Sequence, residues 1–309
     1  MANAPHLAAD RGLFSHCLRV MRPHQWLKNL LVFVPLLAAH QFTSRYLVLQ
    51  ATEAFSSFCL CASAVYVIND LMDIESDRTH PRKKNRPFAS GALLPLQGWI
   101  LAPTLLVASL AVAVSVSKLF CLVLAFYFCT TCLYSFWLKR QVIVDILILA
   151  TLYTFRVIAG AAATMIVPSF WLLAFSMFFF LCLALVKRYS EMIVVQRQNE
   201  SHAAGRGYFT TDSSVILSLG AAAAYNAVLI LALYINSTDV AGLYQNRWML
   251  WLILPPFLYW TTRLWLKAHR GEVHDDPLVF ASTDKHSWGM IAIVGCIFYL
   301  ASSPIQLSL

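Results

Sequence analysis

Acidic side chains gather where the second long apolar stretch of the chain ends. Asp70, Asp73 and Asp77 are spaced i, i+3 and i+7, which places them on one face of a helix. Unpaired carboxylates so close to an apolar stretch would repel one another and would be costly to dehydrate. A divalent cation removes that cost, and a few hard oxygen ligands completed by waters and substrate phosphates commonly hold magnesium. We therefore predict a Mg²⁺ site formed by Asn69, Asp70, Asp73 and Asp77, with an ordinary solvated helix end as the alternative.

A group of cations follows these acids in the same loop. It consists of Arg82, Lys83, Lys84 and Arg86. Beside a bound metal, such cations could clamp a diphosphate leaving group. Arg86 is predicted to contact phosphate because a guanidinium offers a rigid fork to phosphate oxygens, and Lys83 is predicted to help neutralise the same group. The alternative is that the cluster serves only to orient the chain in a membrane.

The composition indicates which solvent surrounds these residues. The chain has 309 residues, of which 59% are hydrophobic and 12% are charged, and its mean hydropathy is +0.65. A soluble domain of this length cannot hide so much apolar surface, so lipid must be the solvent. The net charge of +8 then indicates cationic loops and sites for anionic substrates rather than a nucleic-acid partner.

Long apolar stretches recur along the whole chain, and a membrane helix needs about 20 such residues. They lie near residues 26–41, 49–71, 97–115, 119–137, 142–163, 169–187, 213–235, 247–267 and 287–307. We predict an all-α polytopic membrane bundle of about nine transmembrane helices, folded as a single domain over residues 1–309. Membrane lipids are its predicted surroundings.

Every second connection between these stretches is basic, as at 78–86, 139–140, 187–206 and 263–270. By the positive-inside rule, the N-terminus and the acidic motif lie on the cytoplasmic side of the cytoplasmic membrane, and the C-terminus lies outside. Residues 1–21 have no uninterrupted apolar core and are predicted to form a short cytoplasmic segment rather than a signal peptide.

Several of these features together resemble the UbiA-type intramembrane prenyltransferase superfamily. They are the acids at 69–77, the pair Arg86-Pro87, and Tyr134 with Lys139 after a later span. The resemblance covers nearly the whole chain. It implies a helical bundle around a central cavity, with two Asp-rich motifs that bind Mg²⁺ and an isoprenyl diphosphate. The residues that would then take part in catalysis are Asp73, Asp77, Arg86 and Lys139.

The second Asp-rich motif of that superfamily is replaced here. After the sixth span stands Lys187-Arg188-Tyr189-Ser190-Glu191, with one acid and two cations. This substitution resembles the decaprenyl-phosphate phosphoribosyltransferase branch. Further segments that resemble the branch are 22–29, Asp145 with Tyr153 and Arg156, and 276–284. The branch implies that the Mg²⁺-bound diphosphate belongs to 5-phosphoribosyl 1-pyrophosphate and that the acceptor is a polyprenyl monophosphate.

The number of cations agrees with that reaction, because donor and acceptor together bring three phosphate groups. The available cations are Lys28, Arg86, Lys139, Arg156, Lys187 and Arg188. Arg156 lies in mid-span, where a charge costs at least ~2.5 kcal/mol, so it needs a partner; Tyr153, backbone carbonyls or Asp145 are candidates. Asp145 could accept a hydrogen bond from a ribose hydroxyl or pair with Lys139 or Arg140. The other predicted substrate-binding residues are Asn29, Asn69, Lys83, Tyr134, Tyr153 and Glu191.

Two other functions remain open from the sequence. One is the transfer of an isoprenyl group from its diphosphate to an aromatic acceptor, which a second aspartate cluster would have favoured. The other is transport of an anionic solute, which would need charges along a path through the bilayer or inverted repeats with broken helices. The strong acids cluster at one membrane face instead. The lipid chain length, the number of metal ions and a possible homo-oligomer stay undetermined.

Overall fold

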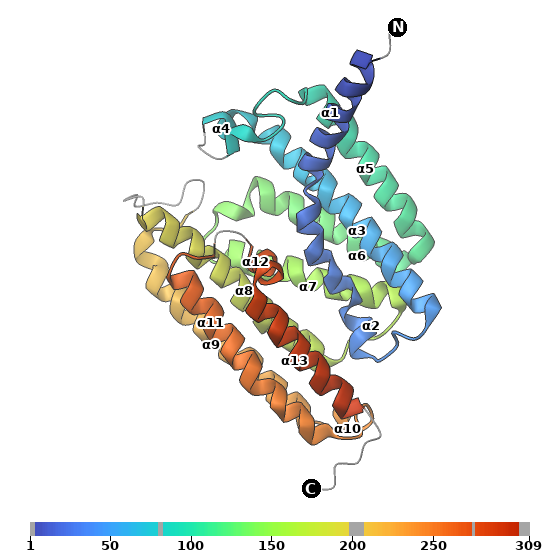
Figure 1. Ribbon diagram of the computed structural model, residues 1–309, viewed down its shortest axis with the longest axis vertical. Coiled ribbons are helices and arrows are strands. Elements are labelled where there is room, and N and C mark those ends of the chain that lie inside the picture. Colours follow the sequence, from blue (N-terminus) through green and yellow to red (C-terminus); the bar gives the residue numbers. More distant parts are fainter. Residues whose placement is uncertain (1–3, 80–82, 198–206, 274–275, 303–309) are drawn as a thin grey trace. The chain divides into compact units, whose positions relative to one another are not determined.

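The computed structural model describes the chain except for residues 1–3, 80–82, 198–206, 274–275 and 303–309, and except for the side chains of 4–11 and 241. The described elements are helices (Figure 1). The chain forms two compact units, one of residues 1–135 with 155–167 and one of residues 136–154 with 168–309. Helix α7 (Val144–Thr164) contributes its first half to the second unit and its second half to the first. The prediction of one domain stays a prediction.

The first unit is organised around α3, which packs along α5 (Figure 1). Its elements are α1 (Ala4–Met21), η1 (Pro23–Phe33), α2 (Val34–Ala38), α3 (Arg45–Met72), α4 (Ile74–Thr79), η2 (Lys83–Asn85), α5 (Pro95–Val116) and α6 (Lys118–Phe136). Ser44 caps α3 by accepting a hydrogen bond from the Leu47 amide at 3.5 Å. Ser57 and Ser109 exchange buried hydrogen bonds of 2.9 and 2.8 Å with each other's carbonyls, which joins α3 to α5.

The second unit is organised around α8, which packs along α9 and contacts α11 and α12. Its elements are η3 (Leu138–Arg140), α8 (Phe170–Arg197), η4 (Thr210–Asp212), α9 (Ser213–Ile235), α10 (Thr238–Ala241), η5 (Arg247–Ile253), α11 (Leu254–His269), α12 (Pro277–Thr283) and α13 (Lys285–Ser302). A Cβ on Gly220 would lie 2.0 Å from the Trp265 ring, so only glycine lets this α11 indole lie against α9.

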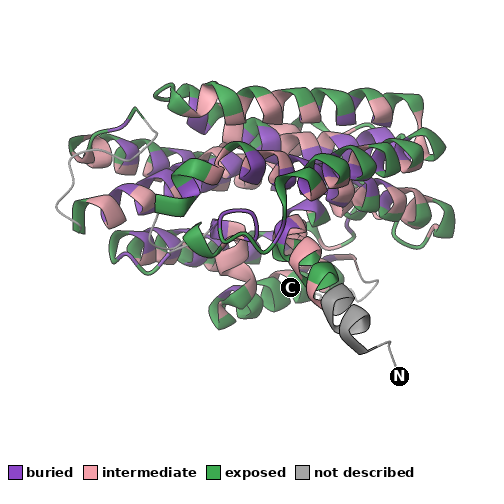
Figure 2. Cartoon of the chain, turned by 90° about the horizontal axis from the view of Figure 1, so that it is seen from above, coloured by how far each residue is buried: buried purple, intermediate pink, exposed green. Residues whose placement is uncertain are grey.

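Six helices of the described chain are long and apolar enough to cross a membrane. They are α3, α5, α6, α7, α8 and the stretch Thr210–Ile235. These helices differ in how far they are buried. In the most apolar 18-residue stretch of α3 and of α7, 61% of the residues are buried, whereas the corresponding share in α5 is 22%. Figure 2 shows long helices with one buried and one exposed side. A helix such as α5, apolar yet mostly exposed, fits a lipid solvent.

The other three predicted spans have a different form, and the count of nine is not confirmed. Residues 26–41 form η1 followed by the short α2, and residues 247–267 form η5 followed by α11. Pro35 and Pro255 lie near the starts of α2 and α11. Proline lacks an amide hydrogen and clashes with the carbonyl four residues earlier, so it is favoured in the first turn of an α-helix, where these two prolines stand. The third, α13, has 18 residues.

A close backbone approach in the first unit lies between η1 and α7. A Cβ built on Gly160 would lie 1.9 Å from the carbonyl oxygen of Val32. Glycine is therefore required here, and the approach places η1 beside the turn of α7 that carries Arg156.

We expect Gly160→Ala to lower the free energy of unfolding by at least ~2 kcal/mol, because the added methyl group meets backbone that cannot rotate away. The midpoint of thermal unfolding in detergent measures this. Gly295→Ala on α13 is the matched control, since a Cβ there meets nothing within 4 Å. Equal midpoints for the two variants would contradict the close approach.

Candidate functional site

Two buried carboxylates share one guanidinium at the end of α3. Arg86 Nη1 donates to Asp70 Oδ1 at 3.1 Å and to Asp77 Oδ2 at 2.7 Å. Arg22 Nη2 also donates to Asp70 Oδ1, at 2.6 Å, and Lys83 Nζ lies 4.0 Å from Asp77 Oδ1. Asp70 and Asp77 are 2% and 1% exposed, so these cations replace the water that the acids have lost.

The acidic motif does not lie on one unbroken helix, and that part of the expectation is wrong. Helix α3 ends at Met72, Asp73 is its C-cap residue, and α4 begins at Ile74. The break is slight, because the Asp77 amide still donates to the Asp73 carbonyl at 2.8 Å. Asp70 and Asp77 still lie close enough to reach the same arginine, Arg86, where the spacing had predicted a shared metal ion. Asn69 and Asp73, which are close to these two acids in sequence, are half-buried.

The fit of these residues to a magnesium ion depends on which oxygen atoms are engaged. Asp77 Oδ1 is buried and accepts no hydrogen bond from the described part of the chain. No group of three His, Cys, Asp or Glu side chains among the described residues could hold a metal ion by itself. Magnesium is commonly held by one or two carboxylates with waters and substrate phosphates as the remaining ligands. Asp77 and the half-buried Asp73 fit that pattern, whereas Asp70 is engaged by two arginines.

Arg22 is held in a strained conformation next to this cluster. Its backbone lies in the left-handed region, with φ 52° and ψ 62°, which costs a non-glycine residue about 1–3 kcal/mol. Pro23 follows it and disfavours the right-handed helical conformation at Arg22. The guanidinium lies 5.1 Å from the Tyr66 ring centroid as well as against Asp70. These contacts offset the strain, and they place Arg22 among the residues of the acidic cluster.

Arg156 has partners from two other segments of the first unit. Its Nε donates to Asn29 Oδ1 and its Nη2 to Tyr127 Oη, both at 2.9 Å. Asn29 in turn donates to Cys59 Sγ at 3.3 Å. Arg156 is 5% exposed. Asn29 and Tyr127 are therefore two partners of Arg156, and neither was among the candidates that the sequence offered. Lys28, next to Asn29, is 9% exposed.

Arg188 and Asp145 form a fully buried ion pair in the second unit, and both are 0% exposed. Arg188 also pairs with Glu191 one turn further along α8. Tyr208 donates to Asp145 Oδ1 at 2.6 Å and accepts from the Ile143 amide at 2.7 Å. Burial and the bond to Asp145 raise the pKa of Tyr208, so its hydroxyl stays a donor. The structure favours the ion-pair interpretation of Asp145, with Arg188 as the partner rather than Lys139 or Arg140.

Lys187, the neighbour of Arg188, turns toward a different acid. Its Nζ lies 3.6 Å from Asp276 Oδ2, and the hydroxyl of Tyr153 donates to the same oxygen at 2.5 Å. Asp276 also caps α12, because its Oδ1 accepts from the Leu278 amide at 3.2 Å. The Tyr153 ring stacks on Phe180 of α8. Lys187 is 27% exposed while Asp276 is 4% exposed, so a buried acid holds a cation that a ligand can reach.

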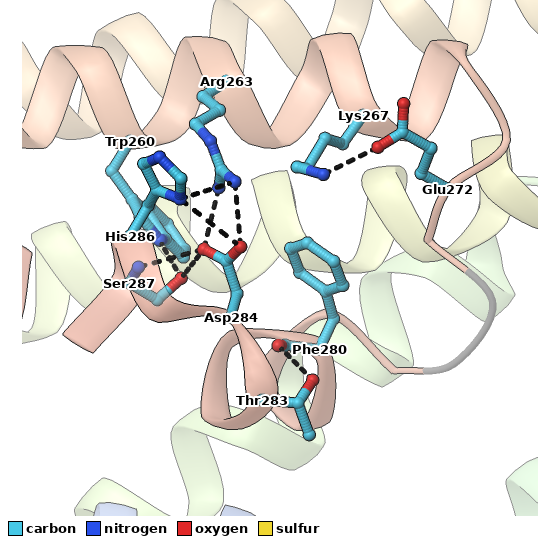
Figure 3. A network of polar contacts seen from close by, with 9 residues as sticks. All are labelled: Trp260, Arg263, Lys267, Glu272, Phe280, Thr283, Asp284, His286 and Ser287. Atoms are coloured by element: carbon cyan, nitrogen blue, oxygen red, sulfur yellow. Dashed lines mark hydrogen bonds and ion pairs between the residues drawn. The ribbon is translucent and has the colours of Figure 1, made fainter. Parts of the chain in front are cut away.

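A further polar network joins α11 to the start of α13 (Figure 3). Arg263 donates to both oxygens of Asp284, at 2.7 and 2.8 Å, and Ser287 donates to Oδ2 through its amide and its hydroxyl, both at 2.9 Å. Burial raises the pKa of Asp284, but the bonds from Arg263 and Ser287 outweigh that effect and hold the pKa at about 2. Trp260 donates to the Ser287 hydroxyl at 2.8 Å. The network fixes the α11–α13 pair and is not part of the predicted site.

The remaining predicted residues lie at their expected elements. Lys139 is half-buried in η3, Tyr134 is half-buried near the end of α6, and Lys83 is exposed in η2. Arg82 lies outside the described residues. Four residues with clear structural roles were absent from the predicted site: Arg22, Tyr127, Tyr208 and Asp276. Arg22 and Asp276 stand within segments already noted for their resemblance, whereas only the structure reveals Tyr127 and Tyr208.

The helical fold and the six long apolar helices together indicate a membrane protein. The model of the UbiA prenyltransferase family matches residues 30–301. The chain belongs to that family. It is accordingly a transferase and an integral membrane protein.

Individual relatives carry different names. A protein of Sinorhizobium fredii named y4nM is 37% identical over 92% of this chain, and the chain spans only 55% of that relative's length. Nodulation protein NoeC of Azorhizobium caulinodans is 34% identical over 93% of this chain and 92% of its own. Decaprenyl-phosphate phosphoribosyltransferase of Mycolicibacterium smegmatis is 37% identical over 62% of each chain.

A solved structure agrees on the fold. A UbiA homologue from Archaeoglobus fulgidus, bound to GPP and Mg²⁺, superposes with a TM-score of 0.67 over 92% of this chain and 99% of its own, at 17% identity. That identity supports the shared fold alone.

We expect Asp145→Asn to lower the free energy of unfolding by about 3 kcal/mol or more, since it leaves the buried guanidinium of Arg188 without its main counter-charge. The double variant Asp145→Leu/Arg188→Met removes both charges and should recover most of that loss. Thermal unfolding in detergent measures both variants. A double variant no more stable than Asp145→Asn would show that the pair is not coupled.

Proposed function

We propose that this protein transfers the 5-phosphoribosyl group of 5-phosphoribosyl 1-pyrophosphate to a polyprenyl phosphate and releases pyrophosphate. The observation that carries the proposal is how the charged side chains of residues 187–191, at the end of the sixth predicted span, are paired. Its one acid, Glu191, is engaged by Arg188, and Lys187 remains partly exposed. A segment of this kind suits a phosphate anion better than a second metal-bound diphosphate.

The donor diphosphate is assigned to the acidic cluster of the first unit. Asp73 and Asp77 would hold Mg²⁺ there, with Asn69 and Asp70 beside them. When bound, that ion would neutralise the charge of the diphosphate oxygens. Arg86 already lies between Asp70 and Asp77, so its guanidinium is placed to exchange a carboxylate for a phosphate oxygen. Lys83, 44% exposed, adds a second cation from η2.

The chemical step needs no general base, because the attacking phosphate oxygen carries no proton that must be removed. The bond between the ribose C1 and the pyrophosphate oxygen breaks, and the pyrophosphate leaves with the electron pair. A new bond forms between C1 and an oxygen of the lipid phosphate, which is already anionic near neutral pH. The contribution of the chain is to position the reactants and to stabilise charge, which are large terms in such reactions. Lys28, Lys139 and Lys187 are the proposed contacts to the acceptor phosphate and the ribose 5-phosphate.

Several residues of the second unit would act by positioning others. Asp145 and Arg188 are too buried to reach a substrate directly, and Tyr208 holds Asp145 in place. They fix the turn of α8 that presents Lys187 and Glu191. Arg156, with Asn29 and Tyr127, gives the first unit a corresponding buried cation.

A second candidate function is prenyl transfer to an aromatic acceptor. The observation that favours it is the likeness in fold to a UbiA homologue solved with GPP and Mg²⁺. Purified protein would be supplied first with labelled 5-phosphoribosyl 1-pyrophosphate and polyprenyl phosphate, and then with prenyl diphosphate and 4-hydroxybenzoate. Mass spectrometry of the lipid product decides between them: a polyprenyl-phosphoryl ribose 5-phosphate supports the proposal, and a prenylated aromatic product overturns it.

We expect Asp73→Ala to reduce turnover by about 10²-fold or more, because it removes a preorganised charge at the diphosphate while leaving the buried pairs of Arg86 intact. Product formation at saturating Mg²⁺ measures this, and an unchanged unfolding midpoint shows that the variant is folded. Ser76→Ala, on the exposed side of α4, serves as the control. Activity that survives Asp73→Ala would refute the assigned metal ligands.

We expect Asp276→Asn to raise the KM for the lipid phosphate by roughly tenfold with little change in kcat, because Lys187 loses the charge that positions it. Asparagine caps a helix about as well as aspartate, so α12 should persist. Steady-state kinetics with varied acceptor provide the readout, and Asp276→Glu should restore the KM in part. A loss confined to kcat, or to thermal stability, would argue against a role through Lys187.

A further inference from the structure

We propose that the groove between α11 and α13 binds an anionic glycerophospholipid, with the lipid phosphate at Lys285 and His286 and an acyl chain along the groove. The groove has a volume of about 350 Å³ and runs between one face of each helix. That volume lies at the lower end of the range for ligand pockets in proteins. The site is separate from the proposed reaction and does not depend on it.

One end of the groove carries the cation of Lys285 beside the imidazole of His286, whose Nδ1 lies 3.1 Å from Arg263 Nη2. Lys285 and His286 both line it, and both are exposed, His286 by 59%. The nearest acid, Asp284, is neutralised by the two bonds from Arg263 (Figure 3). The described part of the chain provides no ion-pair partner for Lys285. The balance at this end is therefore positive, and an anion is the complementary ligand.

The rest of the groove is apolar. Lys285, Gly289 and Ile293 follow one another at i, i+4 and i+8 on α13, so they share a face, and Tyr259 of α11 lines the opposite wall. Tyr259 and Ile293 are 57% and 52% exposed. A Cβ on Gly289 would meet nothing within 4 Å, so the missing side chain leaves open space in the middle of the groove. A chain of methylene groups fits such a space and would cover the exposed apolar atoms.

The combination of one cationic end and one apolar length favours a phospholipid over other occupants. Trp288 is 58% exposed at the same end, on the turn that carries Lys285, and tryptophan is enriched where headgroups meet the hydrocarbon region. Anionic lipids attract basic side chains near the membrane surface. A second copy of this chain would have to bury Lys285 against an acid, and a soluble phosphate would leave the apolar length uncovered.

The test uses the whole protein in detergent, titrated with phosphatidylglycerol or with phosphatidylcholine of the same acyl chains, and followed by native mass spectrometry. We expect phosphatidylglycerol to bind more tightly than phosphatidylcholine. Lys285→Gln should weaken phosphatidylglycerol binding by roughly fivefold, and Gly289→Leu should weaken both lipids because its side chain fills the groove. The matched control is Lys118→Gln, at the exposed first position of α6.

Four results would overturn the proposal. The first is equal binding of the two lipids, and the second is an equal effect of Lys285→Gln and Lys118→Gln. The third is a Gly289→Leu variant that changes from dimer to monomer with lipid binding unaltered, which would identify a second copy of the chain as the occupant. Competition by inorganic phosphate as strong as that by phosphatidylglycerol would also count against it, since it would indicate a site for the free anion.

Discussion

Buried carboxylates, whose negative charge must be balanced by nearby cations, are the interaction on which the rest of this structure depends. Asp70 and Asp77 are almost completely buried. Arg22 binds Asp70 from 48 residues away in sequence, and Arg86 binds Asp77 from 9 residues away. Because dehydrated charges of one sign are costly, these arginines tie η1 and η2 to the end of α3. The same contacts leave Asp77 Oδ1 without a hydrogen bond from the described chain. Charge compensation thus shapes the fold of the first unit and leaves a lone pair for a cation.

In the second unit, each buried carboxylate is balanced by one cation together with one tyrosine hydroxyl. Asp145 is compensated by Arg188 and Tyr208, and Asp276 is compensated by Lys187 and Tyr153. In each case a tyrosine donates to the acid, and Arg188 pairs in addition with a second acid, Glu191. The phosphate-binding potential of this unit therefore resides mainly in Lys187, whose ammonium is partly exposed beside a buried partner.

Much of this was predictable from the sequence. Six apolar stretches form long helices. The spacing of Asp70 and Asp77 predicted that their side chains lie close together, because helical periodicity is local. The breaks at Pro35 and Pro255 carried a local signal as well, which hydropathy alone overlooks. The partners of Arg156 and Asp145 were not predictable, since Asn29, Tyr127, Arg188 and Tyr208 lie from 29 to 127 residues away. Such pairings depend on tertiary packing that periodicity does not encode.

The central claim is that the acids at the end of α3, together with Arg86, receive a metal-bound diphosphate. A cryo-electron microscopy map of the protein with Mg²⁺ and 5-phosphoribosyl 1-pyrophosphate tests it most directly. The account predicts density for an ion against Asp73 and Asp77, with the Arg86 guanidinium turned from at least one carboxylate toward the diphosphate. Arg86 still bound to both Asp70 and Asp77, with the diphosphate located elsewhere, would contradict it.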